Sequence, residues 1–157
     1  MTRTDSFVGM LLVGIVMLFC PMVGLLSDQF GRRRIMTIGA FGFVILAYPL
    51  FSQLDSAPGL PSLLLMQGAM AVCLIFYAAP ASAMLVELFP TRLRTTAIGL
   101  AYALSVAVLG GLTPFILSRL IGWTGGVTSF ALYLDLAASI SLITLALMQD
   151  RTGESLD

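Results

Sequence analysis

The segment GLLSDQFGRRR, residues 24–34, places four charged side chains between two long apolar runs. It ends in three consecutive arginines, Arg32, Arg33 and Arg34. Asp28 either pairs with one of these arginines or accepts hydrogen bonds from the exposed amides at a helix start. Gly31 permits a turn backbone that larger residues resist, and Gly24 leaves room for another helix to approach closely. The segment therefore combines a turn with charges that can pair across it.

A second group of charges lies in the segment ELFPTRLR, residues 87–94. Glu87 is expected near the carboxyl-terminal end of a helix, where the helix dipole disfavours an acid, so it calls for a cationic partner. The candidates are Arg92 and Arg94 just beyond it, or the arginines of the first segment. A pair that forms and breaks would bias one conformation over another, whereas a permanent pair would be a static interface salt bridge. Both interpretations stay open.

Asp135 interrupts the last apolar run near its middle. At the centre of a membrane-spanning helix a charge costs at least about 2.5–3.5 kcal/mol unless it is paired or neutral. Because desolvation favours the neutral acid, a protonated Asp135 would suit a proton-coupling role. The alternative is a packing role, in which Ser139 or Tyr133 forms a hydrogen bond with the carboxyl group.

The composition predicts that membrane-spanning helices position these charges. Hydrophobic residues make up 59% of the chain and charged residues 10%, and the mean hydropathy is +1.01, whereas a soluble domain carries roughly 25% charged residues. Uncharged windows cover residues 6–27, 35–54, 56–86 and 95–118, and a fifth window, 120–149, contains only Asp135. Each is long enough to cross a bilayer as a helix, which takes ~20 residues. The sequence therefore predicts an all-α, polytopic membrane bundle.

Several other classes of protein are disfavoured by the same composition. The net charge is zero and no basic face is present, so nucleic-acid binding has no support. The chain has no histidine, and its two cysteines, Cys20 and Cys73, lie in apolar windows, which argues against a metal site and a disulfide. An intramembrane protease would need two facing acids or a serine with a base, and Asp135 is the single buried acid expected. We therefore do not expect an enzyme.

We predict one membrane domain over residues 1–157, with five spans. Their expected ranges are 7–27, 35–53, 61–88, 95–118 and 127–148. Three arginines lie between the first two spans, none in the next loop, two in the third loop and one in the fourth. By the positive-inside rule the first and third loops are cytoplasmic, so the amino terminus lies outside and the carboxyl terminus in the cytoplasm. Because such an amino terminus is not typical of a chain that starts at its own methionine, we expect that a segment is missing upstream.

Both charged segments resemble motifs of the major facilitator superfamily of transporters. GLLSDQFGRRR matches the pattern Gly-x-x-x-Asp-x-x-Gly-Arg-Arg, which this family carries in the cytoplasmic loop between the second and third helices of each six-helix half. ELFPTRLR, with GGLTP at residues 110–114, is similar to the tenth and eleventh helices, above all in the metabolite:proton symporter branch. That branch moves organic acids and osmolytes such as betaine or proline. Sugar porters share the ELFP-type segment.

The resemblance covers nearly the whole chain and implies that the five spans correspond to helices eight to twelve. It implies the carboxyl-terminal part of a proton-coupled symporter in a bacterial inner membrane, driven by the proton gradient without a cofactor. A small-molecule substrate would bind between two halves, so the missing amino-terminal half, or a complementary chain, would be a partner beside the lipid bilayer. The alternatives are a remnant or assembly subunit without transport, and a fragment of a sugar-porter-type facilitator.

The resemblance also implies roles for the charged segments as a cytoplasmic gate. The residues assigned to it are Gly24, Asp28, Gly31, Arg32, Arg33, Arg34, Glu87, Arg92 and Arg94. In the family the first segment is taken to latch the cytoplasmic side against the opposite half. The alternative is that the arginines set topology and meet anionic lipid head groups, which is worth about 1 kcal/mol each.

Small and polar residues inside the spans are the remaining candidates for helix packing and for a proton or substrate path. Small residues recur every four positions at Gly99, Ala103, Ala107 and Gly111, which predicts close helix packing. Tyr77, Gln67 and Tyr102 are, with Asp135, candidates for a proton or substrate path, against the alternative of aromatic-belt or packing roles. Symporters of this branch often follow the tyrosine corresponding to Tyr102 with asparagine. This chain has Ala103 there, which offers no polar side-chain atom to a substrate.

Overall fold

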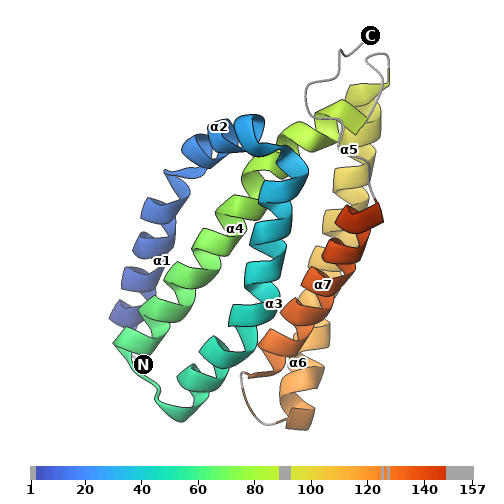
Figure 1. Cartoon of the computed structure of the whole chain (residues 1–157). Helices are drawn as coiled ribbons and strands as arrows, with labels where there is room; N and C mark the ends of the chain where they lie inside the picture. Colours follow the sequence, from blue (N-terminus) through green and yellow to red (C-terminus); the bar gives the residue numbers. More distant parts are fainter. Residues whose placement is uncertain (1–2, 89–92, 125, 127, 148–157) are drawn as a thin grey trace.

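The computed structural model describes residues 3–88, 93–124, 126 and 128–147, and all regular structure in these ranges is helical (Figure 1). The helices are α1 (Arg3–Met17), α2 (Cys20–Phe30), α3 (Arg32–Ser56), α4 (Leu60–Leu88), α5 (Arg94–Ser105), the π-helix η1 (Val106–Gly110), α6 (Gly111–Thr124) and α7 (Thr128–Leu147). By length and composition four helical segments can cross a membrane, and the bent pair α1–α2 is a fifth candidate. The expected all-α bundle of about five spans is confirmed.

The first span consists of two helices, where the sequence analysis expected one continuous helix at 7–27. α1 and α2 meet at a bend of 40°. At the bend the amides of Leu18 and Phe19 donate to carbonyls three residues back, a tighter pattern than that of an α-helix. Pro21 has no N–H and cannot donate to the Met17 carbonyl, so α1 cannot run through it unchanged.

The fourth span, Thr95–Trp123, runs through α5, η1 and α6. In η1 the amide of Gly111 donates to the carbonyl of Val106, five residues back. Pro114 lacks the N–H that would bond to the Gly110 carbonyl, and the π-helical turn directly precedes this gap in the hydrogen-bond ladder. Helix α6 continues to Thr124, whereas the predicted span ended at 118.

Helix α3 is the centre of the packing, with α4 on one side and α7 on the other, while α1 and α2 lie against α4 (Figure 1). Small residues make these contacts close. A Cβ atom added at Gly39 would lie 2.7 Å from the Tyr77 nitrogen and 2.8 Å from the Cys73 oxygen, so α3 and α4 touch backbone to backbone here. Ala47 of α3 and Ala131 of α7 are completely buried.

The antiparallel course of the helices brings the two charged segments to the same end of the bundle. The α2–α3 corner, the end of α4 and the start of α5 lie together at the top of Figure 1. The turn between α3 and α4 and the start of α7 lie at the opposite end. The orientation of the bundle in a membrane stays a prediction.

Candidate functional site

Gly31 forms the corner between α2 and α3. Its φ of 93° and ψ of 125° place it in a region that side chains disfavour, and it is the only residue with positive φ in the described part of the chain. The Gly31 amide donates to the Ser27 carbonyl and its own carbonyl accepts from Ile35, so it ends one helix and begins the next. The corner thus requires glycine at this position.

Asp28 and Arg32 pair across this corner. The Asp28 Oδ1 atom accepts from Arg32 Nη2 at 3.0 Å and from Arg32 Nε at 3.1 Å. The acid is in the last turn of α2 and the arginine is the first residue of α3. Of the two roles considered for Asp28, the structure shows pairing with an arginine. The Asp28 side chain is 54% exposed, so the pair contributes little to stability.

The other two arginines point elsewhere. Arg33 Nη2 donates to the carbonyl of Ala146 at 2.9 Å, in the last turn of α7. Arg34 is exposed. The three consecutive arginines therefore have different neighbours, and Arg33 joins the α2–α3 corner to α7.

The predicted close approach of a helix to Gly24 is not found within the described residues. A Cβ atom at Gly24 would have no neighbour within 4 Å. The same holds at Gly99 and Gly111, and the stripe that they form with Ala103 and Ala107 is exposed. The close helix contact instead lies at Gly39, which the sequence analysis did not select.

The second charged segment is described only in part. Glu87 lies in the last turn of α4 and Arg94 is the first residue of α5. Arg92 lies outside the described residues, as do the side chains of Glu87 and Arg94. The pairing of these charges stays a prediction.

Asp135 lies mid-way along α7 with an unusual environment. Its Oδ1 atom is buried and has no hydrogen-bond partner among the described residues. The Tyr133 hydroxyl, one of the two expected partners, instead pairs with Thr113 Oγ1 at 2.9 Å and so links α7 to α6. Ser139, the other, is exposed.

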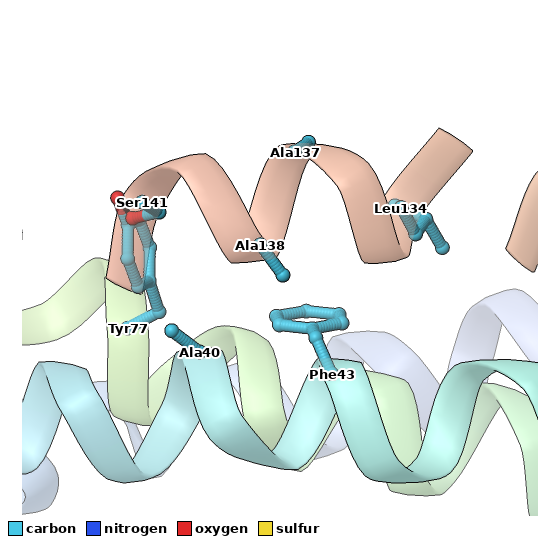
Figure 2. Close-up of a pocket in the computed structure, with 7 residues that line it drawn as sticks. All are labelled: Ala40, Phe43, Tyr77, Leu134, Ala137, Ala138 and Ser141. Carbon is cyan, nitrogen blue, oxygen red and sulfur yellow. Dashed lines mark hydrogen bonds between the residues drawn. The ribbon is translucent and has the colours of Figure 1, made fainter. Parts of the chain in front are cut away.

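Tyr77 lies between two cavities, where its hydroxyl forms a 2.6 Å hydrogen bond with Ser141 Oγ of α7. Figure 2 shows this pair at one end of a cavity of about 210 Å³, with the Phe43 ring directed toward α7. The remaining lining residues are Ala40, Leu134, Ala137 and Ala138. Tyr77 and Ser141 also line a second cavity of about 330 Å³, to which Tyr102 contributes from α5. Two of the predicted path residues thus meet at one cavity.

Gln67 lines a third cavity of about 480 Å³ between α1, α3, α4 and α7. Its Oε1 atom is buried without a hydrogen-bond partner among the described residues. The side chain lies over Gly9, where an added Cβ atom would be 1.8 Å from Oε1. Phe43 and Leu134 line both this cavity and the one in Figure 2, so the two are neighbours.

A sequence model of the Major Facilitator Superfamily matches residues 4–156, nearly the whole chain. The chain belongs to the major facilitator superfamily. The matched residues include the α2–α3 corner with Asp28, Gly31 and Arg32. This family consists of transporters and not of enzymes.

Individual members of the major facilitator superfamily are similar over most of this chain. A citrate-proton symporter of Klebsiella pneumoniae is 32% identical over 160 residues, which cover 99% of this chain and 35% of the symporter. A proline/betaine transporter of Escherichia coli is 34% identical, covering 87% of this chain and 27% of the transporter. A shikimate transporter of the same species is 33% identical over 91% of the chain and 33% of its own length. No solved structure gives a significant match.

The chain spans about a third of the length of these curated relatives. It is a partial, multi-pass member of the superfamily, related to its citrate-proton and proline/betaine transporters. The complete transport machinery of such a relative therefore includes helices beyond those described here.

Sequence reasoning missed several polar contacts within this major facilitator chain. Asp55 was treated as part of a loop, but its Oδ2 atom accepts from the Thr128 amide at 3.0 Å and from the Thr128 hydroxyl. Ser141 and Thr113, which bond to Tyr77 and Tyr133, were not selected either. The partners are 20 to 73 residues apart in the chain, and no local spacing signal announces such a pair.

Proposed function

We propose that this chain is the carboxyl-terminal portion of a proton-coupled symporter for a small organic acid or osmolyte. In this proposal it does not transport alone and works with an amino-terminal half or a complementary chain. The similarity to a citrate-proton symporter and to proline/betaine transporters supports the substrate class. The observation that carries the proposal is the α2–α3 corner, where Gly31 orders the turn and Asp28 pairs with Arg32.

The same corner supports a role as a cytoplasmic gate. An exposed ion pair at the end of two helices can exchange partners at low cost, because such pairs contribute little to stability. A second half that supplied its own charge or helix end would compete for Asp28 or Arg32, and this competition would favour one conformation over the other. Arg34, which is exposed, is available for the same surface.

The proposed orientation has the amino terminus outside and the carboxyl terminus in the cytoplasm of a bacterial inner membrane. The clustering of the arginine-bearing α2–α3 corner with the start of α5 supports it (Figure 1). The candidates for the proton and substrate path remain Asp135, Tyr77, Tyr102 and Gln67. Asp135 and Gln67 carry buried acceptor atoms without partners among the described residues, which supports a functional role.

Co-expression with a complementary half tests this proposal. The chain is produced alone, and together with the amino-terminal helices of the Klebsiella pneumoniae citrate-proton symporter. Uptake of radiolabelled citrate and proline into vesicles is then measured with and without an imposed proton gradient. We expect no uptake by the chain alone and gradient-driven uptake by the pair.

Two results would contradict the proposal. Gradient-driven uptake by the chain alone would show that copies of this chain assemble into a transporter without a second half. Absence of uptake with complementary halves from several relatives, although both parts insert into the membrane and associate, would indicate a subunit or remnant without transport. Pairing the halves of the citrate symporter itself, expressed as two chains, is the positive control.

A further inference from the structure

Helices α3 and α7 run antiparallel and are joined at both ends by charged side chains of α3. Figure 1 shows the two helices side by side, and they are among the most extensively packed pairs in the described residues. Arg33 lies in the first turn of α3, beside the last turn of α7. Asp55 lies in the last turn of α3, beside the first residue of α7.

At one end, Arg33 caps the carboxyl terminus of α7. Its Nη2 atom donates to the Ala146 carbonyl at 2.9 Å, one residue before α7 ends at Leu147. The last four carbonyls of a helix have no partner within the helix, and this end carries a partial negative charge. The guanidinium group of Arg33 supplies both a hydrogen-bond donor for such a carbonyl and a positive charge that complements the partial negative charge.

At the other end, Asp55 caps the amino terminus of α7. Its Oδ2 atom accepts from the backbone amide of Thr128 at 3.0 Å and also from the Thr128 hydroxyl. A Cβ atom at Gly126 would lie 2.8 Å from the same carboxylate oxygen, so Gly126 also packs directly against Asp55. The amino-terminal end of a helix carries a partial positive charge, which a carboxylate complements.

Between these caps the helices are held by apolar and hydroxyl contacts. Phe51 of α3 stacks on Phe130 of α7, with ring centroids 6.1 Å apart and planes 1° from parallel. Tyr77 of α4 bonds to Ser141 of α7 at 2.6 Å, which includes α4 in the same unit (Figure 2). The contact of Gly39 with the α4 backbone completes the connection between α3 and α4.

The fourth span is packed very differently. No residue of Thr95–Trp123 is buried, and α5 makes few contacts with α4. The span is interrupted by the π-helical turn η1, a type of irregularity at which helices kink and which is frequent at functional sites. The span is linked to α7 by the hydrogen bond between Thr113 and Tyr133, and Thr113 lies just after the π-helical turn in the chain.

We propose that Arg33 and Asp55 are positioning residues that clamp α7 to α3 by both of its helix ends. The clamp makes α3, α4 and α7 one rigid body, against which the α5 part of the fourth span moves about η1. Arg33 then belongs to this clamp and not to the exchanging charges of the gate. The inference rests on the proposed function only for the purpose of the motion, which would be part of a transport cycle.

Distances between pairs of spin labels on the 157-residue chain in lipid vesicles test the clamp. The labels are attached to cysteines in a Cys20→Ala, Cys73→Ala background. One pair, Gln53→Cys with Leu132→Cys, reports the Asp55 end, and a second, Ile38→Cys with Ile143→Cys, reports the Arg33 end. A third pair, Ile38→Cys with Leu104→Cys, reports the distance from α3 to α5. All five positions are exposed.

We expect narrow distance distributions for both α3–α7 pairs and a broad one for the α3–α5 pair. Asp55→Ala should broaden the first pair only, and Arg33→Ala the second pair only. Arg34→Ala, which removes the neighbouring exposed arginine, is the matched control and should change neither. Asp55→Asn keeps an acceptor oxygen without the charge, so it should broaden the first pair less than Asp55→Ala does.

Equal effects of Arg33→Ala and Arg34→Ala, or no effect of Asp55→Ala, would overturn the clamp. An α3–α5 distribution as narrow as those of the α3–α7 pairs would overturn the motion of α5. Because these measurements use no substrate and no second half, their outcome is independent of whether the chain takes part in uptake.

Discussion

Gly31 has a backbone conformation that strongly disfavours any residue with a side chain. We predict that Gly31→Ala destabilises the chain by about 1–3 kcal/mol, because a side chain at this φ and ψ is strained whatever space surrounds it. The measurement is the unfolding midpoint of the purified chain in mixed micelles. Gly31→Ala should also disturb the pairing of Asp28 with Arg32, since the two residues are held by the corner.

Gly24 provides the matched control for this substitution. It lies inside α2 with ordinary helical surroundings, and an added Cβ atom would meet nothing within 4 Å. Gly24→Ala should therefore leave stability unchanged or raise it by up to about 1 kcal/mol, because alanine favours helix more than glycine does. Equal destabilisation by the two substitutions would contradict the account of Gly31.

Asp135 combines a cost in stability with a proposed role in transport. Asp135→Leu removes a buried acceptor without a partner among the described residues, so we predict a gain of about 1–3 kcal/mol in the same unfolding measurement. In a complete assembly, Asp135→Asn should abolish the dependence of uptake on the proton gradient. A functional acid that lowers stability is the pattern expected of a proton-carrying residue in a membrane helix.

Tyr133→Phe is the control for Asp135. It removes the hydroxyl that bonds to Thr113 and should cost about 1 kcal/mol while leaving proton coupling intact. If uptake by the Asp135→Asn assembly remained coupled to protons, the acid would have a packing role only.

The polar contacts that sequence reasoning recovered are the local ones. Asp28 and Arg32 are four residues apart, and the glycine between them signals the turn, so their pairing was within reach of a spacing argument. Arg33 and Ala146 are 113 residues apart, and Asp55 and Thr128 are 73 apart. Such contacts depend on the antiparallel packing of α3 on α7, which hydropathy alone does not define.

The stripe predicted to pack in the fourth span meets no helix within the described residues at Gly99 and Gly111, so its packing stays a prediction. Glycine and alanine at four-residue spacing allow close approach but do not require it, and the face with Gly99 and Gly111 meets no helix within the described chain. Gly39 and Ala40, which do pack closely, lie in a helix whose small residues follow no such regular pattern. The pattern shows where a helix can approach, whereas the contact depends on which helices are neighbours.

Hydropathy recovered the spans and missed their internal irregularities. The five windows of the sequence analysis, four uncharged and one containing only Asp135, are each long enough to cross a bilayer and so indicated five apolar segments. The bend before Pro21 and the π-helical turn before Pro114 are caused by single missing N–H donors. The form that each irregularity takes depends on the hydrogen bonds around the proline, which a hydropathy window does not contain.

The α3–α4 contact gives a prediction for this pair of helices. Gly39→Ala places a Cβ atom less than 3.0 Å from the α4 backbone, so the helices must separate, and we predict a loss of about 1–3 kcal/mol in stability. Gly14→Ala in α1 is the control, because an added Cβ atom there meets nothing within 4 Å. A Gly39→Ala variant as stable as the Gly14→Ala variant would contradict the close packing.

The molecule as a whole has a compact side and an open side. The buried hydrophobic residues of the described chain all lie in helices α3, α4 and α7, and the fourth span contributes none. Part of the exposed apolar surface would face lipid in any membrane bundle. The length of the relatives, about three times that of this chain, is the reason to expect that other helices cover part of it.

The orientation of the chain in the membrane follows from the distribution of arginines and can be tested directly. Single cysteines are introduced in the Cys20→Ala, Cys73→Ala background and treated with a membrane-impermeant thiol reagent on intact cells. Ser56→Cys, at the end of α3, and Trp123→Cys, near the end of α6, should be labelled from outside. Gln29→Cys, beside the arginine-bearing corner, should react only after permeabilisation, because its three neighbouring arginines are retained in the cytoplasm.

The same labelling distinguishes the arginine signal from other determinants of topology. Replacing Arg32, Arg33 and Arg34 together by glutamine removes the strongest retention signal, and we expect a fraction of molecules to expose Gln29→Cys to the outside. Arg119→Gln, which removes one arginine from the opposite end, should strengthen the original orientation. Labelling of Gln29→Cys in intact cells of the unmodified arginine background would place the gate corner outside, where a cytoplasmic latch cannot operate.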